Sequence, residues 1–371
     1  MLKIFLTGDA HVGLKYARRR KGAYLEEVRL KAFELMVEQA NSERCGLFVI
    51  SGDMFEDGFQ CTRAEVKELV SMLSKFRGTV AILPGNHDYY AAESPLWQYL
   101  SELTAATGNI VLLVETRPYI LNVGGDRVIL YPAPCMSLHS SENNIGWIKD
   151  QEIDPDAGYH IGIAHGTLKG ESMDSEEVYF PMTREELSAI PMDVWLLGHV
   201  HVPYPRNLTV DSYTKGETIF NAGTHVQPHH ACNTEGCAFV IQIDEQKNVF
   251  AKKCVTGPIR FFSKEVKVAA GTLKDKLNQA LVDIPDNSVV DVNLLGAVTA
   301  DEYDRRAEII APMLSRFIEA DYSDFSLSKL LSQEMIDKTF PETSFQAKLL
   351  KTLMADPKEA QLAFELLTTL K

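Results

Sequence analysis

The chain has 371 residues, of which 45% are hydrophobic, so it can bury a full core and has room for two or three domains. Its 51 acidic and 37 basic residues give a formal net charge of -14, which argues against a protein that coats nucleic acid through many Lys and Arg contacts to phosphate. No apolar run approaches the roughly 18 residues of a membrane-spanning helix. We therefore expect a cytoplasmic protein with no membrane association, and six scattered cysteines without a C-x-x-C pair fit reduced thiols.

The first two thirds of the chain alternate short apolar runs with amphipathic segments. Residues 24–44 and 63–76 carry apolar side chains at helical spacing and are predicted to be helices. The apolar runs are too short for helices and predict buried strands at 4–6, 47–50, 80–83, 161–163 and 194–197. Further strands are predicted at 128–131, 218–221, 238–243 and 249–255. The pattern predicts an α/β fold in which helices flank a two-layered β-sandwich core.

The best predicted domain boundary is the break at Thr256-Gly257-Pro258. Beyond it the pattern restarts with a strand, a helix, a second strand and a longer helix, predicted at 261–268, 273–281, 289–295 and 300–320. The remainder is helical by pattern, with a break at Asp356-Pro357. We therefore predict a large first domain over 1–257, a small α+β domain over 258–326 and a helical C-terminal segment over 327–371.

Asp, Asn or His side chains follow five of the predicted strands. They are Asp9 and His11, then Asp53, then Asn86, His87 and Asp88, then His165, and last His199 and His201. In α/β sheets the carboxyl ends of the strands are where ligands and catalytic groups collect, so these clusters can converge on one pocket. In an extended stretch both members of a D-x-H or H-x-H pair point to the same side, so each pair can act jointly.

The donor types predict a site for two divalent metal ions. Carboxylate, imidazole and one amide oxygen, without thiolate, suit Mn, Fe or Zn, and the mix alone does not choose among them. Two such ions about 4 Å apart need a shared ligand. Asp53 is the natural bridge, because it is the strong anionic ligand of its segment and directly follows a glycine.

In this order D-x-H, G-D, G-N-H-D, a strand-end H-G and G-H-x-H resemble the motifs of the calcineurin-like metallophosphoesterase superfamily, over roughly residues 1–230. The resemblance implies the metallophosphoesterase fold and two divalent ions, for which we expect manganese, with iron or zinc as alternatives. One ion would be held by Asp9, His11, Asp53 and His201, and the other by Asp53, Asn86, His165 and His199.

The resemblance also implies that His87 is a catalytic histidine that faces the scissile phosphate without binding metal. It would stabilise the charge of the transition state or protonate the leaving oxygen, and it would be oriented by Asp88 or by a backbone carbonyl. For Asp88 a catalytic role of this kind and a loop-capping role are equally compatible with the sequence.

A narrower resemblance is to the SbcD and YhaO type of DNA repair nuclease subunit. It rests on the long loop after the first strand, on Gly52-Asp53-Met54-Phe55 and on the small α+β unit after Pro258, which would then be a capping domain. Glu56 stands where many nucleases of that family have a further histidine, which leaves a second-histidine contribution to exonuclease chemistry in doubt. The resemblance implies a DNA substrate and an SbcC-like coiled-coil ABC ATPase as partner, and it leaves a homodimer open.

Two further segments are candidates for substrate binding. Arg18, Arg19 and Arg20 form a basic run just after the first motif, where they could meet a backbone phosphate, although a solvated basic loop is an equal alternative. His225 follows the last motif closely enough to line the same pocket.

The predicted function is that of a two-metal-dependent phosphodiester hydrolase, a DNA repair exonuclease or endonuclease subunit that acts with an SMC-like ABC ATPase. The alternative is a stand-alone phosphodiesterase or phosphatase acting on a small phosphorylated molecule, and the domain after Pro258 favours the nuclease. A scaffold with a degenerate site is disfavoured because no expected ligand is missing. The apolar stripes of 327–371 predict docking on the ATPase, with packing on the small domain of the same chain as the alternative.

Overall fold

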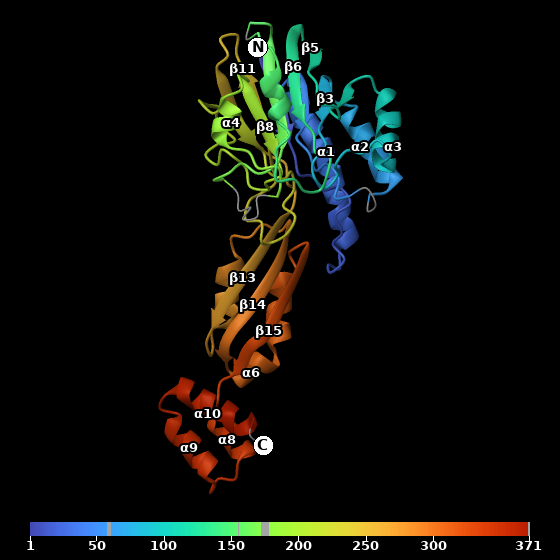
Figure 1. The fold of residues 1–371 in the computed structure, drawn as a ribbon. Helices are drawn as coiled ribbons and strands as arrows, with labels where there is room; N and C mark the ends of the chain where they lie inside the picture. Colours follow the sequence, from blue (N-terminus) through green and yellow to red (C-terminus); the bar gives the residue numbers. More distant parts are fainter. Residues whose placement is uncertain (58–60, 155, 172–177, 370–371) are drawn as a thin grey trace. The chain divides into compact units, whose positions relative to one another are not determined.

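The computed structural model describes residues 1–57, 61–154, 156–171 and 178–369 (Figure 1). The chain divides into two compact units, Met1–Arg260 and Phe261–Lys371. The sequence prediction of a helical segment up to residue 371 includes residues 370–371, which lie outside the described residues.

Two β-sheets form the centre of the first unit. The seven-stranded sheet has the order β4 (Ile110–Leu112), β3 (Thr79–Ile82), β2 (Leu47–Ile50), β1 (Leu2–Thr7), β11 (Cys237–Ile243), β12 (Val249–Val255) and β9 (Thr214–Lys215). The five-stranded sheet has the order β10 (Ile219–Asn221), β8 (Val194–Gly198), β7 (Tyr159–His165), β6 (Asp126–Ala133) and β5 (Tyr119–Val123). Every strand predicted for the first unit is present, and the predicted two-layered core is confirmed.

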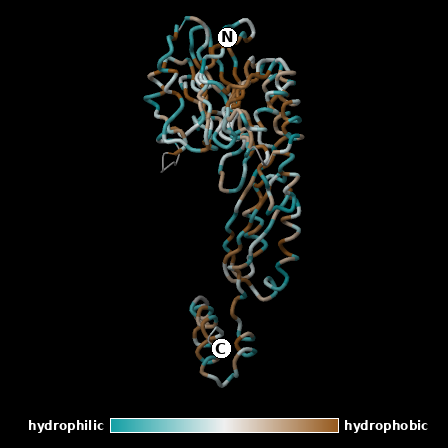
Figure 2. Tube along the Cα trace, turned by 45° about the vertical axis from the view of Figure 1, so that its right-hand side comes forward, coloured by the Kyte–Doolittle hydropathy of each residue, from teal (hydrophilic) through white to brown (hydrophobic). Residues whose placement is uncertain are grey.

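Alternate side chains of each central strand enter different layers of the core. In β1, Leu2, Ile4 and Leu6 belong to the cluster that also contains strand residues of the second sheet, whereas Phe5 packs with residues of the helices. Both faces of the strand are therefore covered, which is why these strands appear in the sequence as continuous apolar runs. Figure 2 shows the hydrophobic residues concentrated along these strands.

Helices cover the outer faces of both sheets. Helices α1 (Gly22–Ser42) and α2 (Arg63–Leu73) confirm the two predicted helices, and α3 (Pro95–Ala105) is an additional helix that begins with a proline. Residues of all three helices pack in the cluster around Phe5. The outer face of the five-stranded sheet packs against residues of the 3-10 helix η1 (Gly146–Asp150) and of α4 (Arg184–Ser188).

The strand directions place the carboxyl ends of five strands at one edge. Strands β1, β2 and β3 are mutually parallel neighbours, and so are β7 and β8 in the other sheet. A bridge between Gly8 and Thr224 joins the ends of the two sheets. The loops after β1 and β2 are also hydrogen-bonded to each other, because His11 N donates to Asp53 O at 2.9 Å. This edge is where the predicted metal ligands lie.

The second unit contains a three-stranded sheet with helices packed against its apolar residues. The strands are β13 (Arg260–Val268), β14 (Ser288–Val298) and β15 (Glu319–Lys329), in that order, and the helices are α5 (Leu273–Leu281), α6 (Ala300–Asp304) and α7 (Arg306–Leu314). Leu273, Leu277 and Leu281 of α5 join Val290 and Leu294 of β14 in one cluster.

The prediction of one helix over 300–320 is wrong at its C-terminal end. Helix α7 ends at Leu314, and β15 begins at Glu319 and runs to Lys329, so the segment from 327 does not begin as a helix either. Residues 319–329 pair in parallel with β14 along almost their whole length. This pairing is a long-range contact that local periodicity does not reveal.

Three short helices follow, α8 (Gln333–Thr339), α9 (Phe345–Leu353) and α10 (Pro357–Thr369), and the predicted break at Asp356-Pro357 separates the last two. Their buried residues form a cluster of their own around Ile336, Phe340 and Leu350. Phe345, Leu362 and Leu366 are exposed large hydrophobic residues on the same helices. Among the described residues, no helix has the length and hydrophobicity needed to cross a membrane.

The separate cluster of α8–α10 predicts where the chain can be shortened. A chain that ends after Leu330 keeps all of β15 and should retain the main unfolding transition of the parent. A chain that ends at Ser326 loses Leu327, which is buried in the cluster of the three-stranded sheet, together with the last strand pairs of β14 and β15. We expect it to melt at least about 5 °C lower in that unit, the scale for losing a large buried side chain.

Differential scanning calorimetry of the two shortened chains beside the parent measures this difference. Equal melting temperatures for both shortened chains would show that the end of β15 contributes nothing to the stability of the unit.

Candidate metal centre

The predicted ligands come together at the shared edge of the two sheets. Three groups of side chains have potential ligand atoms within 4.8 Å of one another, namely Asp9, His11 and His201, then His11, Asp53 and His87, and last Asp53, His165 and His199. The first and third groups follow the two ligand sets that the motif resemblance implies, and Asn86 joins the third through its side-chain oxygen.

The first group is built on the loop after β1 and the loop after β8. His11 Nε2 lies 3.0 Å from His201 Nε2, so two imidazole nitrogens face the same point. Asp9 is fully buried, and its Oδ1 accepts a hydrogen bond from His199 N at 2.8 Å, while its Oδ2 has no hydrogen-bond partner. Buried polar atoms are nearly always satisfied, so this buried Oδ2 fits the role of a metal ligand.

Asp53 lies between the two ligand groups. Its Oδ2 is 3.7 Å from His11 Nε2 and 3.3 Å from His165 Nε2, whereas its Oδ1 accepts a hydrogen bond from His87 N at 2.8 Å. One carboxylate oxygen of Asp53 therefore faces both groups and the other is held by the backbone, and the bridging of two ions by Asp53 stays a prediction.

The second group surrounds the side-chain oxygen of Asn86. Asn86 Oδ1 lies 3.0 Å from His165 Nε2 and 2.9 Å from His199 Nδ1. His165 Nδ1 lies 2.9 Å from the carbonyl oxygen of Ser51, which only accepts, so Nδ1 carries the proton and Nε2 is available to a metal.

The pKa shifts of the buried ligands favour the binding of a cation. Burial raises the pKa of Asp9 to about 8, so without a cation this carboxyl would be neutral at pH 7. Burial acts to raise the pKa of Asp53 as well, but the neighbouring His165 and His11 hold it well below its ordinary value. Burial also lowers the pKa of His201 to about 3, which keeps its imidazole neutral and available as a ligand. A divalent cation favours the carboxylate form of Asp9, so these oxygen and nitrogen donors fit a pair of divalent metal ions, and they do not select which metal.

Two glycines allow the ligand loops to approach this closely. Gly52 has φ +105°, and a Cβ on it would lie 2.1 Å from His165 Nδ1. A Cβ on Gly85 would lie 2.2 Å from both the backbone N and the Oδ1 of Asp53. Any larger residue at either position would push a ligand away from the cluster.

His87 lies beside the ligands and is oriented by a backbone carbonyl. Its Nδ1 is 3.1 Å from the carbonyl oxygen of Glu56, and its ring meets the ring of His11 edge to face at 4.8 Å. Asp88 does not orient this ring, since its Oδ1 accepts from Gly85 N at 2.7 Å and its Oδ2 from Phe55 N at 3.0 Å. Of the two roles open to Asp88, its contacts are those of a buried loop cap, which corrects its assignment as a catalytic residue.

Glu56 supports the metal ligand His11 through its carboxylate. Glu56 Oε2 lies 2.9 Å from His11 Nδ1, and this close contact with His11 lowers the pKa of Glu56. A carboxylate in this position fixes the ring and increases the basicity of the ligand nitrogen. In the sequence Glu56 stood out only as a departure from the histidine of related nucleases, and the contact with His11 needed the structure.

Arg29 is a functional residue that the sequence analysis missed. It lies on α1, is 1% exposed, and donates from Nε to Ala10 O at 2.6 Å and from Nη1 to Val226 O at 2.9 Å. Its Nη2 also donates to Thr224 Oγ1 at 3.0 Å. The guanidinium thereby holds the loop of Asp9 and His11 against the loop after β10. The sequence feature that could have identified Arg29 is its position as a charged residue within the apolar stripe of α1.

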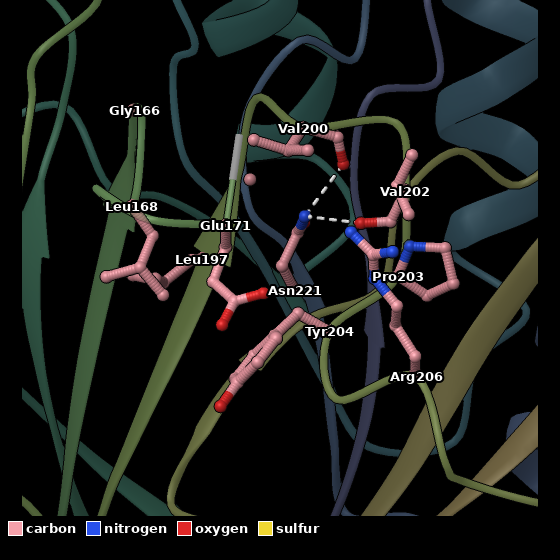
Figure 3. A pocket seen from close by; sticks show the side chains of 11 residues that line it. Gly166, Leu168, Glu171, Leu197, Val200, Val202, Pro203, Tyr204, Arg206 and Asn221 are labelled. Carbon is pink, nitrogen blue, oxygen red and sulfur yellow. Dashed lines mark hydrogen bonds between the residues drawn. The ribbon is translucent and has the colours of Figure 1, made fainter. Parts of the chain in front are cut away.

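Asn221 holds the loop of His199 and His201 in a similar way. Its Nδ2 donates to Val200 O at 2.7 Å and to Val202 O at 3.1 Å, and Figure 3 shows both bonds beside a small pocket lined in part by Leu197 and Tyr204. The loop between the two histidine ligands is therefore fixed by a side chain from a neighbouring strand.

The prediction that His225 binds substrate is wrong. His225 is completely buried, its Nε2 lies 2.8 Å from the carbonyl oxygen of Arg29, and its ring packs on Phe33. Arg18 and Arg20 are exposed and Arg19 is half-buried, all on the segment before α1, and their contact with a phosphate stays a prediction.

Comparisons with known proteins agree with this geometry. The family model of the calcineurin-like phosphoesterases matches residues 2–203. The chain is 25% identical over 183 residues to the uncharacterized metallophosphoesterase YhaO of Bacillus subtilis, which covers 48% of this chain and 42% of that protein. It is 27% identical over 213 residues to the DNA double-strand break repair protein Mre11 of Methanopyrus kandleri, covering 53% of this chain and 44% of that protein. The chain thus matches less than half the length of either relative.

Two of the similar solved structures have TM-scores below 0.5. Protein TT1561 of Thermus thermophilus has a TM-score of 0.42 and 10% identity, over 69% of this chain and 99% of that one. A purple acid phosphatase from yellow lupin seeds has a TM-score of 0.41 and 14% identity, over 69% of this chain and 51% of that one.

The bridging position of Asp53 predicts the effect of its replacement. Asp53→Asn removes the charge that the two ligand groups share, so at least one metal ion should be lost. Activity should fall by more than about 100-fold, which exceeds the loss seen when a residue that only hydrogen-bonds to a metal ligand is replaced. Metal analysis and phosphodiester hydrolysis measure both effects, with the exposed Asp211→Asn as control. Two bound ions and normal turnover in Asp53→Asn would contradict the assignment.

The contact of Glu56 with His11 predicts a graded loss of metal affinity. Glu56→Ala should weaken metal binding by about 10- to 100-fold, and Glu56→Gln, which keeps an acceptor without the charge, should weaken it less. Titration of the metal-free protein with Mn²⁺, followed by calorimetry, measures the affinity. The exposed Glu142→Ala serves as control. If Glu56→Ala binds the metal as the parent does, Glu56 has no role in holding His11.

Proposed function

The chain belongs to the calcineurin-like phosphoesterase family, and from this we propose that it is a nuclease that cleaves phosphodiester bonds of DNA. It is a metal-dependent phosphoesterase. The observation that carries the proposal is that the implied metal ligands meet at one sheet edge, with His87 beside His11 and Asp53. The relative Mre11 is named as a DNA double-strand break repair protein, which supports DNA as the substrate.

The residues of the chain have separate tasks in the proposed reaction. Asp9, His11, Asp53 and His201 would hold one ion, and Asp53, Asn86, His165 and His199 the other. When bound, the two ions supply Lewis acids for the phosphoryl oxygens and lower the pKa of a bound water. The loops keep these donors in place before substrate arrives, so little reorganisation is needed during the reaction.

His87 would protonate the leaving oxygen. The Glu56 carbonyl accepts from Nδ1, so Nε2 is the nitrogen left for the substrate. In its protonated form the imidazole would donate a proton from Nε2 to the departing oxygen. The fixed ring orientation limits this transfer to one nitrogen.

A substrate comparison tests the proposal against a small-molecule phosphatase. The protein is incubated with Mn²⁺ and end-labelled single- and double-stranded DNA, beside bis-p-nitrophenyl phosphate and a panel of nucleotides. Metal-dependent cleavage of DNA and of the diester, absent in Asp53→Asn, is expected. Hydrolysis of nucleotides or other phosphate monoesters without cleavage of DNA would contradict the nuclease and indicate a phosphatase.

The position of His87 predicts a loss of rate without a loss of metal. His87→Ala should lower the rate of diester hydrolysis by about 100-fold, the scale for a positioned acid or base, and should retain two ions. Rates with bis-p-nitrophenyl phosphate and metal content are measured together, and the exposed His139→Ala is the matched control. Loss of metal in His87→Ala would instead make His87 a ligand.

We further propose that α8–α10 dock on an SbcC-like coiled-coil ABC ATPase. These helices bury a small cluster of their own, and Phe345, Leu362 and Leu366 remain exposed, which leaves apolar surface for a partner. The double substitution of Leu362 and Leu366 by Asp should abolish co-purification with the ATPase and preserve diester hydrolysis. The exposed Val282→Asp in the same unit is the control. Undiminished co-purification would exclude this surface.

A further inference from the structure

A pocket of about 770 Å³ lies beside His87 and is formed by segments from three parts of the first unit. Glu56 and Asp57 line one part, residues between His87 and Trp97 line the largest part, and Leu138 comes from the segment after β6. We propose that this pocket, called here the His87 pocket, binds the nucleobase of a nucleotide next to the cleaved bond. The proposal rests on the proposed nuclease function and specifies which part of the substrate the site recognises.

His87 connects this pocket to the metal ligands. Its ring nitrogen lies within 4.8 Å of the ligand atoms of His11 and Asp53, and the same residue lines the pocket. A phosphate bound at the metal ligands would therefore have one of its two substituents next to the His87 pocket. The volume of the pocket is within the usual range of small-ligand sites, about 300 to 1,000 Å³.

Tyr89 offers an aromatic surface on a rigid backbone. Tyr89 lines the pocket and is 42% exposed. Trp97 Nε1 donates to both Asp88 O at 2.9 Å and Tyr89 O at 3.1 Å, which fixes the backbone on which the ring is carried. An exposed ring that is held in this way is suited to stacking against a base, because little freedom is lost on binding.

Leu138 provides an apolar surface on a segment anchored to the same loops. It is 43% exposed and lies three residues after Cys135. Cys135 N donates to Pro84 O at 3.2 Å, and Cys135 O accepts from Tyr90 N at 2.9 Å. Because these bonds tie the segment before Leu138 to the chain on both sides of His87, the pocket has a defined form without a ligand.

The charges of the lining residues favour a neutral ring over a second phosphate. Glu56 and Asp57 contribute carboxylates, and none of the described residues that line the pocket is Lys or Arg. These carboxylates would repel a second phosphate. The amino and ring N–H groups of a base can donate to a carboxylate, as cytosine N4 does to Glu or Asp in other complexes. Apolar surface, a stacking ring and acceptors together match a nucleobase.

Abasic substrates test the proposal on the unaltered protein. Single-stranded, end-labelled oligonucleotides are compared that are intact or carry one tetrahydrofuran abasic residue on the 5′ or the 3′ side of the cleaved bond. We expect kcat/KM to fall by about tenfold for one of the two abasic positions, the scale of losing one stacked base. Equal rates for all three oligonucleotides would overturn the base pocket and leave the nuclease function intact.

Variants of Tyr89 show whether this pocket is responsible. Tyr89→Ala should lower kcat/KM on the intact oligonucleotide by about tenfold, and the abasic residue should then cost the variant much less than it costs the parent, because both changes remove one interaction. Tyr89→Phe, which keeps the ring, should restore the rate. Ile120→Ala, at an exposed apolar residue of β5, is the control.

Melting temperature, metal content and kcat/KM together distinguish the possible outcomes. Melting temperature and metal content establish that Tyr89→Ala is folded and loaded. Additive costs of the variant and the abasic residue would overturn the assignment to Tyr89. Failure of the parent to cleave any oligonucleotide, with hydrolysis of monoesters, would overturn the proposed function and with it the base pocket.

Discussion

The convergence of buried carboxylate and imidazole groups on one oxygen of Asp53 is the constraint on which the rest of the structure depends. Groups of this kind are costly to remove from water unless charge and hydrogen bonds compensate them. In this fold, parallel strands of the two sheets end at the same edge, so five loops place donor atoms in one small volume. Gly52 and Gly85 stand where a side chain would collide with His165 or Asp53. A pair of divalent cations would complete this arrangement electrostatically, since Asp9 Oδ2 is buried without a hydrogen-bond partner.

A second set of residues holds the ligand loops without contributing donor atoms to the metal groups. Arg29 donates to backbone oxygens of two loops, Asn221 fixes the loop between His199 and His201, and the Asp88 carboxylate accepts from Gly85 and Phe55. These contacts use backbone groups that would otherwise be buried without partners. They also make the positions of the ligands independent of substrate, which is the preorganisation that electrostatic catalysis requires.

His87 has a place in both parts of the proposed site. Its backbone N–H holds the bridging carboxylate, its ring is oriented by the Glu56 carbonyl, and its side chain also lines the neighbouring pocket. Glu56 is similarly shared, because its carboxylate contacts His11 while its carbonyl contacts His87. The metal ligands Asp53 and Asn86, the proposed acid His87 and most residues of the proposed base pocket therefore lie on one short stretch of backbone after β2 and one after β3. Because these two stretches contribute to both sites, the proposed site of hydrolysis and the proposed site of base recognition are adjacent.

Local patterns of the sequence determined the helices at 24–44 and 63–76, most strands of the first unit and the Asp, Asn and His residues at the strand ends, because periodicity and strand-end position act over a few residues, whereas β4, β5 and β9 were not predicted. Tertiary structure alone decided the rest. Strand β15 exists because it pairs with β14, and the contact of Arg29 with Val226 joins residues far apart in the chain. The sequence placed Asp88 and His225 close to the motifs, but proximity along a loop does not set the direction of a side chain. Packing turned Asp88 toward the backbone and buried His225 against α1, since each polar atom took the nearest partner that the folded chain offered.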